Sequence, residues 1–463
     1  MIRKFIGDKA FYKKIWVLIL PIMLQNAVTH FVSMIDNIMI GSMGTEQMSA
    51  VAIVNQIIFV FNLTVFGVVG GIGIFTAQYF GKNDEKGVKE TIRLMLATGA
   101  IVLIIAIIIF SLGGTWLINS YLHEGNEPMD LSLALKEGQK YLFIMLFGLL
   151  PFTLAQVYGS AQRIIEKPVP PMIAGIAAVF TNVTLNYILI FGNFGFPRLG
   201  VTGAAIATLI SRYVEALIII IWAHAEKDKF NPFRSLYKNF KISISGVKLM
   251  LPKAFPLIAN ETCWGLGIAL QNSALSIRGL DVIAAVNMTS TITNLFNITI
   301  FSFGTAISIV VGGLLGAGKI EEAIDTNRKM TFLSASIATM LAIILTFVAP
   351  HFPKIYNTTE NVMKLGTAFI ICYAAYTPFN ALMNSFYFAI RSGGKTVITF
   401  IFDSVYMLCI TVPFTYFLAH FTNLTIIPVY ALMLSIDIFK VAFGFYLISK
   451  KTWAQNIVSK SEL

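Results

Sequence analysis

Charged residues are scarce in this sequence. They make up 12% of its 463 residues, whereas a soluble globular protein carries about 25%. Hydrophobic residues make up 56%, and the mean hydropathy is +0.76. Because a soluble core does not explain so large a deficit, we expect lipid to surround most of the chain. A bilayer-spanning helix needs ~20 apolar residues, and we expect twelve such helices, centred near residues 28, 65, 104, 150, 182, 213, 262, 300, 338, 377, 408 and 437.

Cysteine and histidine are also rare, with three and five residues. Cys263, Cys372 and Cys409 all lie in apolar stretches, without the spacing of a disulfide framework or a metal motif. The apolar stretches contain no paired DxxxD, no histidine-rich cluster and no HExxH motif, so a membrane-embedded enzyme is not expected. We expect no cofactor either.

Acidic residues are fewer than basic ones, and the net charge is +11. The basic residues do not form a nucleic-acid-binding patch, because they gather in both terminal tails and in alternate loops. The opposite loops hold only Lys136, Lys140, Arg198, Arg278, Lys354 and Lys364. By the positive-inside rule, both termini and the central loop are cytoplasmic. No cleavable signal peptide is expected, and a bacterial inner membrane is the expected location.

The two halves of the sequence resemble each other at an offset of 235 residues. Aligned pairs include Pro21 with Pro256, Gly44 with Gly279, Gly81 with Gly316, and Arg93 with Arg328. Because each half holds an even number of helices, the repeats enter the membrane in the same sense. We therefore predict an all-α membrane protein with two pseudo-twofold related bundles of six helices. The bundles comprise residues 1–225 and 249–463, joined by a cytoplasmic linker at 226–248.

Two pairs of opposite charges occupy related places in the halves. Arg212 and Glu215 lie three residues apart on the sixth helix, and Asp437 and Lys440 do so on the twelfth. Side chains at this spacing are neighbours on a helix surface. We expect each pair to neutralise itself within its own helix and to be structural.

Asp36 stands at the far end of an apolar run that begins at Ile15. A charged side chain at the bilayer centre costs ~2.5–3.5 kcal/mol and marks a functional site by default. One helix face carries Gln25, Thr29, Ser33 and Asp36. We expect this polar face to border a cavity or another helix. The alternative is an ordinary acid near the outer headgroups.

Asn182 and Asn186 lie one turn apart on the fifth helix. Small hard cations prefer oxygen ligands. We therefore expect the two amide oxygens to be able to join Asp36 around Na⁺. The alternative is that both amides only bridge helices.

Two further acids lack a neighbouring base in the sequence. Glu261 lies on the seventh helix, where the first half has Asn26, so the acids of the two halves stand at different levels. This asymmetry suits two binding events, one for a coupling ion and one for a substrate or proton. The alternative for Glu261 is a protonated side chain bonded to a neighbouring helix. Asp403 lies near Lys395 and the cytoplasmic surface, and we rank it lower.

Several stretches together carry a family resemblance. They are SMIDNIMIGSMGTEQMSAVAIVNQI (33–57), GIFTAQYFGKND (73–84), GVTGAAIAT (200–208), FPLIANETCWGLG (255–267) and GGLLGAGKIEEA (312–323). In this order over twelve helices they resemble the multidrug and toxic compound extrusion (MATE) family, and in particular its NorM-like bacterial members. None of them is a catalytic signature.

The resemblance implies an alternating-access antiporter that exports organic cations or amphiphilic drugs in exchange for Na⁺ or H⁺. By matching motif, the coupling site comprises Asp36, Asn182, Asn186 and Thr208, with a Na⁺ site at the first three. Glu261 matches the helix-seven acid of the NorM-like members. We expect it to form a substrate or proton site with Gln25, Asn380, Asn384 and Asp403. NorM-like members often have a further acid on helix ten, where this chain has only two asparagines, so the coupling ion stays open. We expect a monomer to be functional.

The alternative function is a lipid-linked oligosaccharide flippase of the same superfamily. Its cleft would display several basic residues for pyrophosphate. Arg212 and Lys440 are the only bases inside apolar segments, and each has an acid three residues away. The sequence therefore favours the antiporter.

Overall fold

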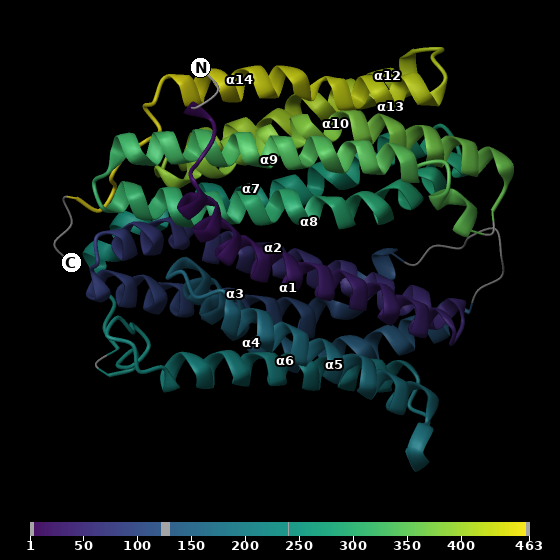
Figure 1. Cartoon of the computed structure of the whole chain (residues 1–463). Helices are drawn as coiled ribbons and strands as arrows, with labels where there is room; N and C mark the ends of the chain where they lie inside the picture. Colours follow the sequence, from purple (N-terminus) through teal and green to yellow (C-terminus); the bar gives the residue numbers. More distant parts are fainter. Residues whose placement is uncertain (1–3, 122–129, 239, 357, 460–463) are drawn as a thin grey trace. The chain divides into compact units, whose positions relative to one another are not determined.

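The computed structural model describes residues 4–121, 130–238, 240–356 and 358–459, without the side chains of residues 32–34, 37, 38, 45 and 280. All regular elements in these ranges are helices (Figure 1). They are α1 (Lys9–Gly41), α2 (Thr45–Gly81), α3 (Glu85–Tyr121), α4 (Leu131–Ile164), α5 (Val169–Phe191), η2 (Asn193–Gly195), α6 (Val201–Ala225), α7 (Ile244–Ser276), α8 (Leu280–Gly316), α9 (Ile320–Val348), η3 (Phe352–Ile355), α10 (Glu360–Ser392), α11 (Thr396–Phe400), η4 (Ile401–Val405), η5 (Met407–Thr411), α12 (Val412–Phe421), α13 (Ile426–Ser435) and α14 (Asp437–Ser449).

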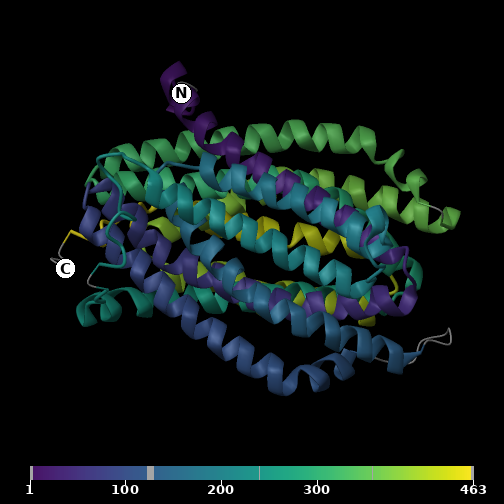
Figure 2. The same ribbon diagram turned by 90° about the horizontal axis from the view of Figure 1, so that it is seen from below.

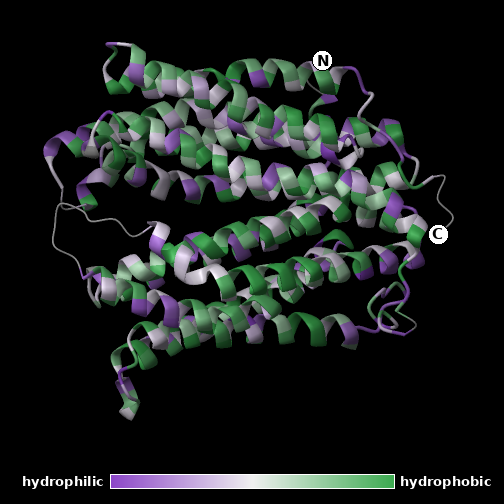
Figure 3. Cartoon of the chain, turned by 180° about the vertical axis from the view of Figure 1, so that it is seen from behind, coloured by the Kyte–Doolittle hydropathy of each residue, from purple (hydrophilic) through white to green (hydrophobic). Residues whose placement is uncertain are grey.

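Eleven helical stretches among the described residues are long and apolar enough to cross a membrane. Two of them are composite, because α11 to α12 form one stretch and α13 with α14 form another. The 33-residue α7, which aligns with α1 in the repeat, completes the twelve. Hydrophobic residues run along the helices, and hydrophilic ones gather mainly at their ends and in the connections (Figure 3). Helices suit lipid because each bonds its own backbone groups, and the all-α prediction of twelve membrane helices is confirmed.

Residue contacts divide the chain into two compact units. The C-terminal unit contains Met1–Ile19, Ala77–Asp84 and Met250–Glu462, and the N-terminal unit contains Leu20–Thr76 and Glu85–Leu249. The start of α1 and the end of α2 thus group with the second half of the sequence. The sequence repeat instead divides the chain into residues 1–225 and 249–463 with a linker at 226–248, and this division stays a prediction.

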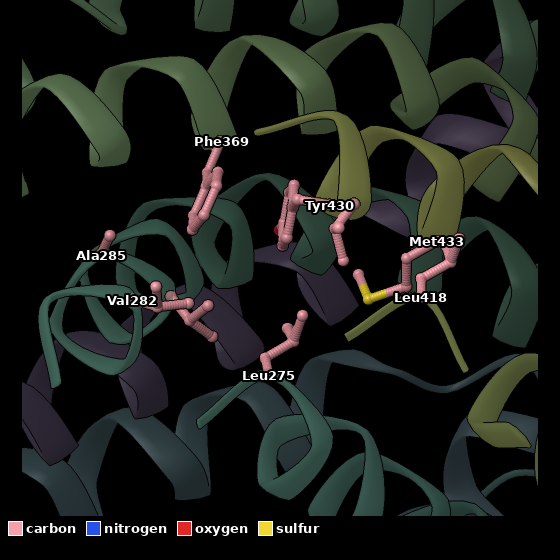
Figure 4. Packing of buried hydrophobic residues seen from close by; sticks show 9 residues of the cluster. Leu275, Val282, Ala285, Phe369, Leu418, Tyr430 and Met433 are labelled. Carbon is pink, nitrogen blue, oxygen red and sulfur yellow. The ribbon is translucent and has the colours of Figure 1, made fainter. Parts of the chain in front are cut away.

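The core of the C-terminal unit is built around α10, which packs against α8, α9, α13 and α14. One apolar cluster joins α10 to α7, α8, α12 and α13, and Figure 4 shows Phe369 and Tyr430 facing each other within it. Their rings stack with centroids 4.2 Å apart. Val282 and Ala285 of α8 are buried in the same cluster. Such aromatic pairs contribute about 0.5–1.5 kcal/mol beyond the area that they bury.

In the N-terminal unit, α4 packs against α3 and α6, and α6 also packs against α5 (Figure 2). Asp130 caps α4, and the hydrogen bond from the Ser132 hydroxyl lowers the pKa of its carboxyl. The segment after α6 packs on the same unit, because Phe233 is buried and stacks on Tyr158 with centroids 5.2 Å apart. Arg93 of α3 donates to the Leu236 carbonyl at 2.8 Å. This part of the linker is therefore docked.

Within the C-terminal unit, α2 and α8 cross at two glycines that the repeat aligns. A Cβ on Gly81 would overlap the backbone of Gly313, and a Cβ on Gly316 would overlap the backbone of Gln78. Gln78 and Gly313 are themselves separated by the repeat offset. The contact is therefore reciprocal, and only glycine permits so close an approach of two backbones.

The buried Gln78 also forms hydrogen bonds with the segment of residues 453–458. Its Nε2 donates to the carbonyls of Ser392 at 2.9 Å and Gln455 at 3.0 Å, and its Oε1 accepts from the Ile457 amide at 2.8 Å. Asn456 donates to the Gly316 carbonyl at 3.0 Å. We call residues 453–458 the C-terminal strap; it joins the ends of α2, α8 and α10.

Replacing Gln78 by leucine is expected to destabilise the protein by about 1–3 kcal/mol for each buried group that loses its partner. The substitution removes three hydrogen bonds and leaves two carbonyls and one amide without the side chain that satisfies them. The thermal unfolding temperature of the detergent-purified protein measures the effect. Gln455→Ala is the matched control, because the exposed Gln455 contributes its main-chain carbonyl to this contact. Equal melting temperatures for Gln78→Leu and wild type would contradict the role of the strap.

Candidate functional site

Asp36 of α1 meets two amides of α5 within the N-terminal unit. Asn186 Nδ2 donates to Asp36 Oδ1 at 2.7 Å. Asn182 and Asn186 are buried, with exposed fractions of 5% and 1%. Their spacing of one helical turn places both amides on one face of α5. The structure thus brings together the three residues expected to surround a cation.

The Asn182 amide can serve Asp36 in two orientations. One of its two terminal atoms lies 2.7 and 2.9 Å from the Asp36 oxygens, and the other lies 3.3 Å from Thr208 Oγ1. With its nitrogen toward Asp36, the amide donates to an ionised carboxylate. With its oxygen toward Asp36, it accepts from a protonated carboxyl group or shares a cation with it. The site can therefore accommodate the carboxyl group both with and without a bound positive charge.

Further oxygen atoms complete this cluster. Thr208 of α6 contributes its hydroxyl, as expected. Asn186 Oδ1 is buried and has no hydrogen-bond partner among the described residues. Tyr141 of α4, which the sequence did not single out, is buried beside Thr208 and bonds Asn55 at 3.4 Å. The described residues contain no group of three His, Cys, Asp or Glu that could hold a metal, so a cation here would rely on the Asp36 carboxylate together with amide and hydroxyl oxygens.

The polar face leading to Asp36 is only partly described. Gln25 Oε1 accepts from Arg163 of α4 at 3.4 Å, so the protein itself supplies a partner for this amide. Thr29 Oγ1 donates to the Gln25 carbonyl at 2.9 Å, which is a bond within the helix. The Ser33 side chain lies outside the described residues. A cavity along this face stays a prediction.

Glu261 is not an unpaired acid. In the C-terminal unit its carboxylate lies 3.8 Å from the guanidinium of Arg391, on α10. Tyr387, one turn before Arg391, donates to Glu261 at 3.5 Å. The prediction that no base neighbours Glu261 was wrong, because the partner is 130 positions away in the sequence.

Asp403 is not unpaired either, and the predicted charge pair of the last helix is not formed. Lys440 donates to Asp403 at 2.8 Å, and the other Asp403 oxygen accepts from Asn260 at 3.0 Å. Asp437, three residues before Lys440, instead bonds the Tyr376 hydroxyl at 2.8 Å. The self-neutralising pair was therefore wrong, because Lys440 reaches across to η4.

The charges of the pair on the sixth helix interact, but the two side chains are not in direct contact. Within the described chain, Arg212 and Glu215 form no ion pair; Arg212 donates to the Gly148 carbonyl at 3.3 Å and lies 5.2 Å from the Phe152 ring. Arg212 and Lys440 are also not the only buried bases, since Arg391 is 8% exposed. The count of bases used against the flippase was thus too low.

The two helix-ten asparagines have separate surroundings. Asn380 donates to Asn297 of α8 at 3.1 Å, and Asn297 in turn bonds Tyr373 at 2.8 Å. Asn384 Oδ1 is buried without a hydrogen-bond partner in the described part of the chain, and it lies against Gly304. Neither asparagine is hydrogen-bonded to Glu261 there. Their role in substrate binding stays a prediction.

Comparison with known proteins gives one family and a consistent set of relatives. The MatE family model matches residues 21–188 and 256–417, and the two matches begin at the aligned prolines of the repeat. The chain is 23% identical over 454 residues to a protein of Thermotoga maritima named "Probable multidrug resistance protein NorM", covering 97% of this chain and 95% of that protein. A protein of the same name from Bacillus cereus is 26% identical over 420 residues, covering 89% of each.

Solved structures share the fold. A MATE protein crystallised in complex with MaL6 superposes with a TM-score of 0.85 at 20% identity, covering 97% of this chain and 98% of that one. A MOP superfamily transporter from Pyrococcus furiosus gives a TM-score of 0.86 at 20% identity, covering 97% of each chain. At this identity the likeness concerns the fold alone.

Proposed function

The chain belongs to the MatE family, and on that premise we propose that it is a secondary antiporter exporting organic cations or amphiphilic drugs. Na⁺ or H⁺ moves in the opposite direction by alternating access. The relatives named as multidrug resistance proteins support the export of drugs. We place the chain in the plasma membrane with both termini cytoplasmic, acting as a monomer and leaving its solute chemically unchanged.

The observation that carries this proposal is the cluster of Asp36, Asn182, Asn186 and Thr208 in an apolar unit. A carboxylate among donors and neutral oxygens can hold one positive charge and release it. With the Asn182 nitrogen toward it, the ionised carboxylate is satisfied by two amide donors. When Na⁺ or H⁺ binds to Asp36, each amide either turns its oxygen toward the ion or the protonated carboxyl group, or loses its hydrogen bond to Asp36. Coupling then requires only that ion and solute prefer different states of the transporter.

The flippase alternative is less well supported, because the buried bases are engaged by the chain itself. Lys440 bonds Asp403 at 2.8 Å, and Arg391 lies 3.8 Å from Glu261. Arg212 contacts a carbonyl and the face of Phe152. A pyrophosphate would have to displace these partners. We therefore retain the antiporter.

Efflux from proteoliposomes tests the function. We expect ethidium, a fluorescent cation, to be exported when an opposing Na⁺ or pH gradient is imposed, and to stop when an ionophore collapses that gradient. Chemical analysis of the exported ethidium should find it unchanged. Ethidium export at the same rate with and without the Na⁺ and pH gradients would contradict antiport. Movement of a pyrophosphate-linked lipid that does not depend on either gradient would favour the flippase.

A further inference from the structure

One residue, Ile436, separates the two helices of the last membrane-spanning stretch in the C-terminal unit, and its backbone angles stay helical (φ −58°, ψ −29°). α13 ends at Ser435 and α14 begins at Asp437. The carbonyl of Ile436, between them, accepts from the Tyr406 hydroxyl at 2.7 Å. This bond holds the residue between η4 and η5 against the start of α14.

The elements that face Ile436 are irregular. η4 and η5 are π-helical, and Tyr406 lies between them. π-helical turns are rare and frequent at functional sites. Asp403 of η4 and Thr411 of η5 both bond residues of α14. The π-helical segment and the start of α14 therefore meet at one group of polar side chains.

The charges at this place do not balance. The described network contains three acids, Glu261, Asp403 and Asp437, and two bases, Arg391 and Lys440. Arg391 lies 3.8 Å from Glu261, and Lys440 lies 2.8 Å from Asp403. Within the described residues, no Lys, Arg or His nitrogen lies within 4.0 Å of the Asp437 carboxylate. One acid therefore remains without a base of its own.

Hydroxyl groups supply the contacts of this acid. The Tyr376 hydroxyl of α10 donates to Asp437 Oδ2 at 2.8 Å, and Thr411 Oγ1 donates to Oδ1 at 3.4 Å. A hydroxyl can donate to a carboxylate and can accept from a protonated carboxyl group. Asp437 is half-buried, so the protein does not fully enclose its carboxyl group. Its contacts therefore suit both protonation states.

We propose that Asp437 is an exchangeable proton site of the C-terminal unit, separate from the Asp36 cluster. The charged and titratable groups that face it are Tyr376 of α10, Asp403 of η4, Tyr406 between η4 and η5, and Lys440 of its own helix. With Lys440 held by Asp403, an added proton makes the group of Asp403, Lys440 and Asp437 neutral. An uncompensated charge in an apolar surrounding is unfavourable, so proton binding is the expected response.

The use of this proton in transport rests on the proposed function, but its binding does not. If the chain is an antiporter, Asp437 gives the C-terminal unit a titrating group of its own. Loss of Asp437 would then reduce the number of protons moved for each solute, and loss of Asp36 would act independently.

Infrared difference spectroscopy on the lipid-reconstituted protein tests the binding without any transport assay. Spectra are recorded between acidic and alkaline buffers in which N-methylglucamine replaces Na⁺. Wild type is expected to give a pH-dependent carbonyl band of a protonated buried carboxyl group. Asp437→Asn should lose that band. Glu321→Gln, which removes an acid of the same unit with an 83% exposed side chain, should keep it.

The variant Tyr376→Phe tests the assignment of the band to Asp437 even if Asp437→Asn does not fold. Removing the hydroxyl that bonds Asp437 should shift the frequency of the same band without abolishing it. The proposal is overturned if the wild-type bands all persist in a folded Asp437→Asn protein, or if no band moves in Tyr376→Phe. If the band responds to both substitutions as expected but the protein shows no ion-driven efflux, the proton site is supported and the antiporter function is rejected.

Discussion

Replacing Asp36 by asparagine is expected to abolish ion-driven export of ethidium from proteoliposomes. The amide cannot bind a proton or neutralise Na⁺, so the coupling ion loses the one charge that the described cluster of amides and hydroxyls contains. A loss of 1.4 kcal/mol already weakens an equilibrium ~10-fold, and we expect at least that decrease in the initial rate. The amide is similar in size to the carboxyl group, so the melting temperature should change little.

The controls separate coupling from folding. Glu46→Gln removes another acid of the same unit, in the first turn of α2, and should export at the wild-type rate. Asn186→Ala removes the donor that bonds Asp36 at 2.7 Å, and an intermediate rate is expected. Wild-type export by Asp36→Asn would reject the coupling site even though the family assignment stands. If Glu261→Gln alone stops export, the coupling acid belongs to the C-terminal unit instead.

Replacing Gly316 by alanine is expected to produce the largest loss of stability of any single methyl addition considered. The new Cβ would overlap the backbone of Gln78 in α2, and a backbone cannot move aside as a flexible side chain can. Overpacking typically costs ~1–3 kcal/mol and occasionally more, and we expect the upper end here. Thermal unfolding and the monodisperse fraction in size-exclusion chromatography measure the loss.

Two other glycines make this test specific. Gly81→Ala places its methyl group against Gly313 at the same crossing, so a comparable loss is expected. Gly113 lies within α3 with nothing within 4 Å of a built Cβ. Gly113→Ala should therefore be neutral or stabilise by ~0.4–1 kcal/mol. If Gly316→Ala melts like Gly113→Ala, the close crossing of α2 and α8 is not real.

Much of the architecture could be predicted because lipid constrains sequence so strongly. Long apolar runs and the offset between Pro21 and Pro256 predicted twelve helices, and the MATE resemblance is confirmed by the family match. The meeting of Asp36 with Asn182 and Asn186 was also foreseen. One acid in an apolar run and two amides one turn apart leave few alternatives, although their functional role is still a prediction.

The charge partners in the C-terminal unit could not be predicted in the same way. Lys440 has Asp437 three residues before it, but the structure gives it Asp403, which lies on a π-helical segment. Side chains on a π-helical segment do not follow the α-helical spacing of 3.6 residues per turn. That spacing therefore places a residue such as Asp403 on the wrong face of its helix. Glu261 likewise finds Arg391 only through the packing of α7 and α10. Sequence spacing reports neighbours on one helix, and these partners lie on different ones.

The C-terminal strap has a consequence for biosynthesis. Gln78 is made early, but the groups that bond its amide belong to Ser392, Gln455 and Ile457, the last two almost at the end of the chain. Until these residues are synthesised, the Gln78 side chain at the end of α2 lacks the hydrogen-bond partners that it has in the folded protein. A chain that lacks residues 453–458 is therefore expected to leave the Gln78 amide without its partners at Gln455 and Ile457.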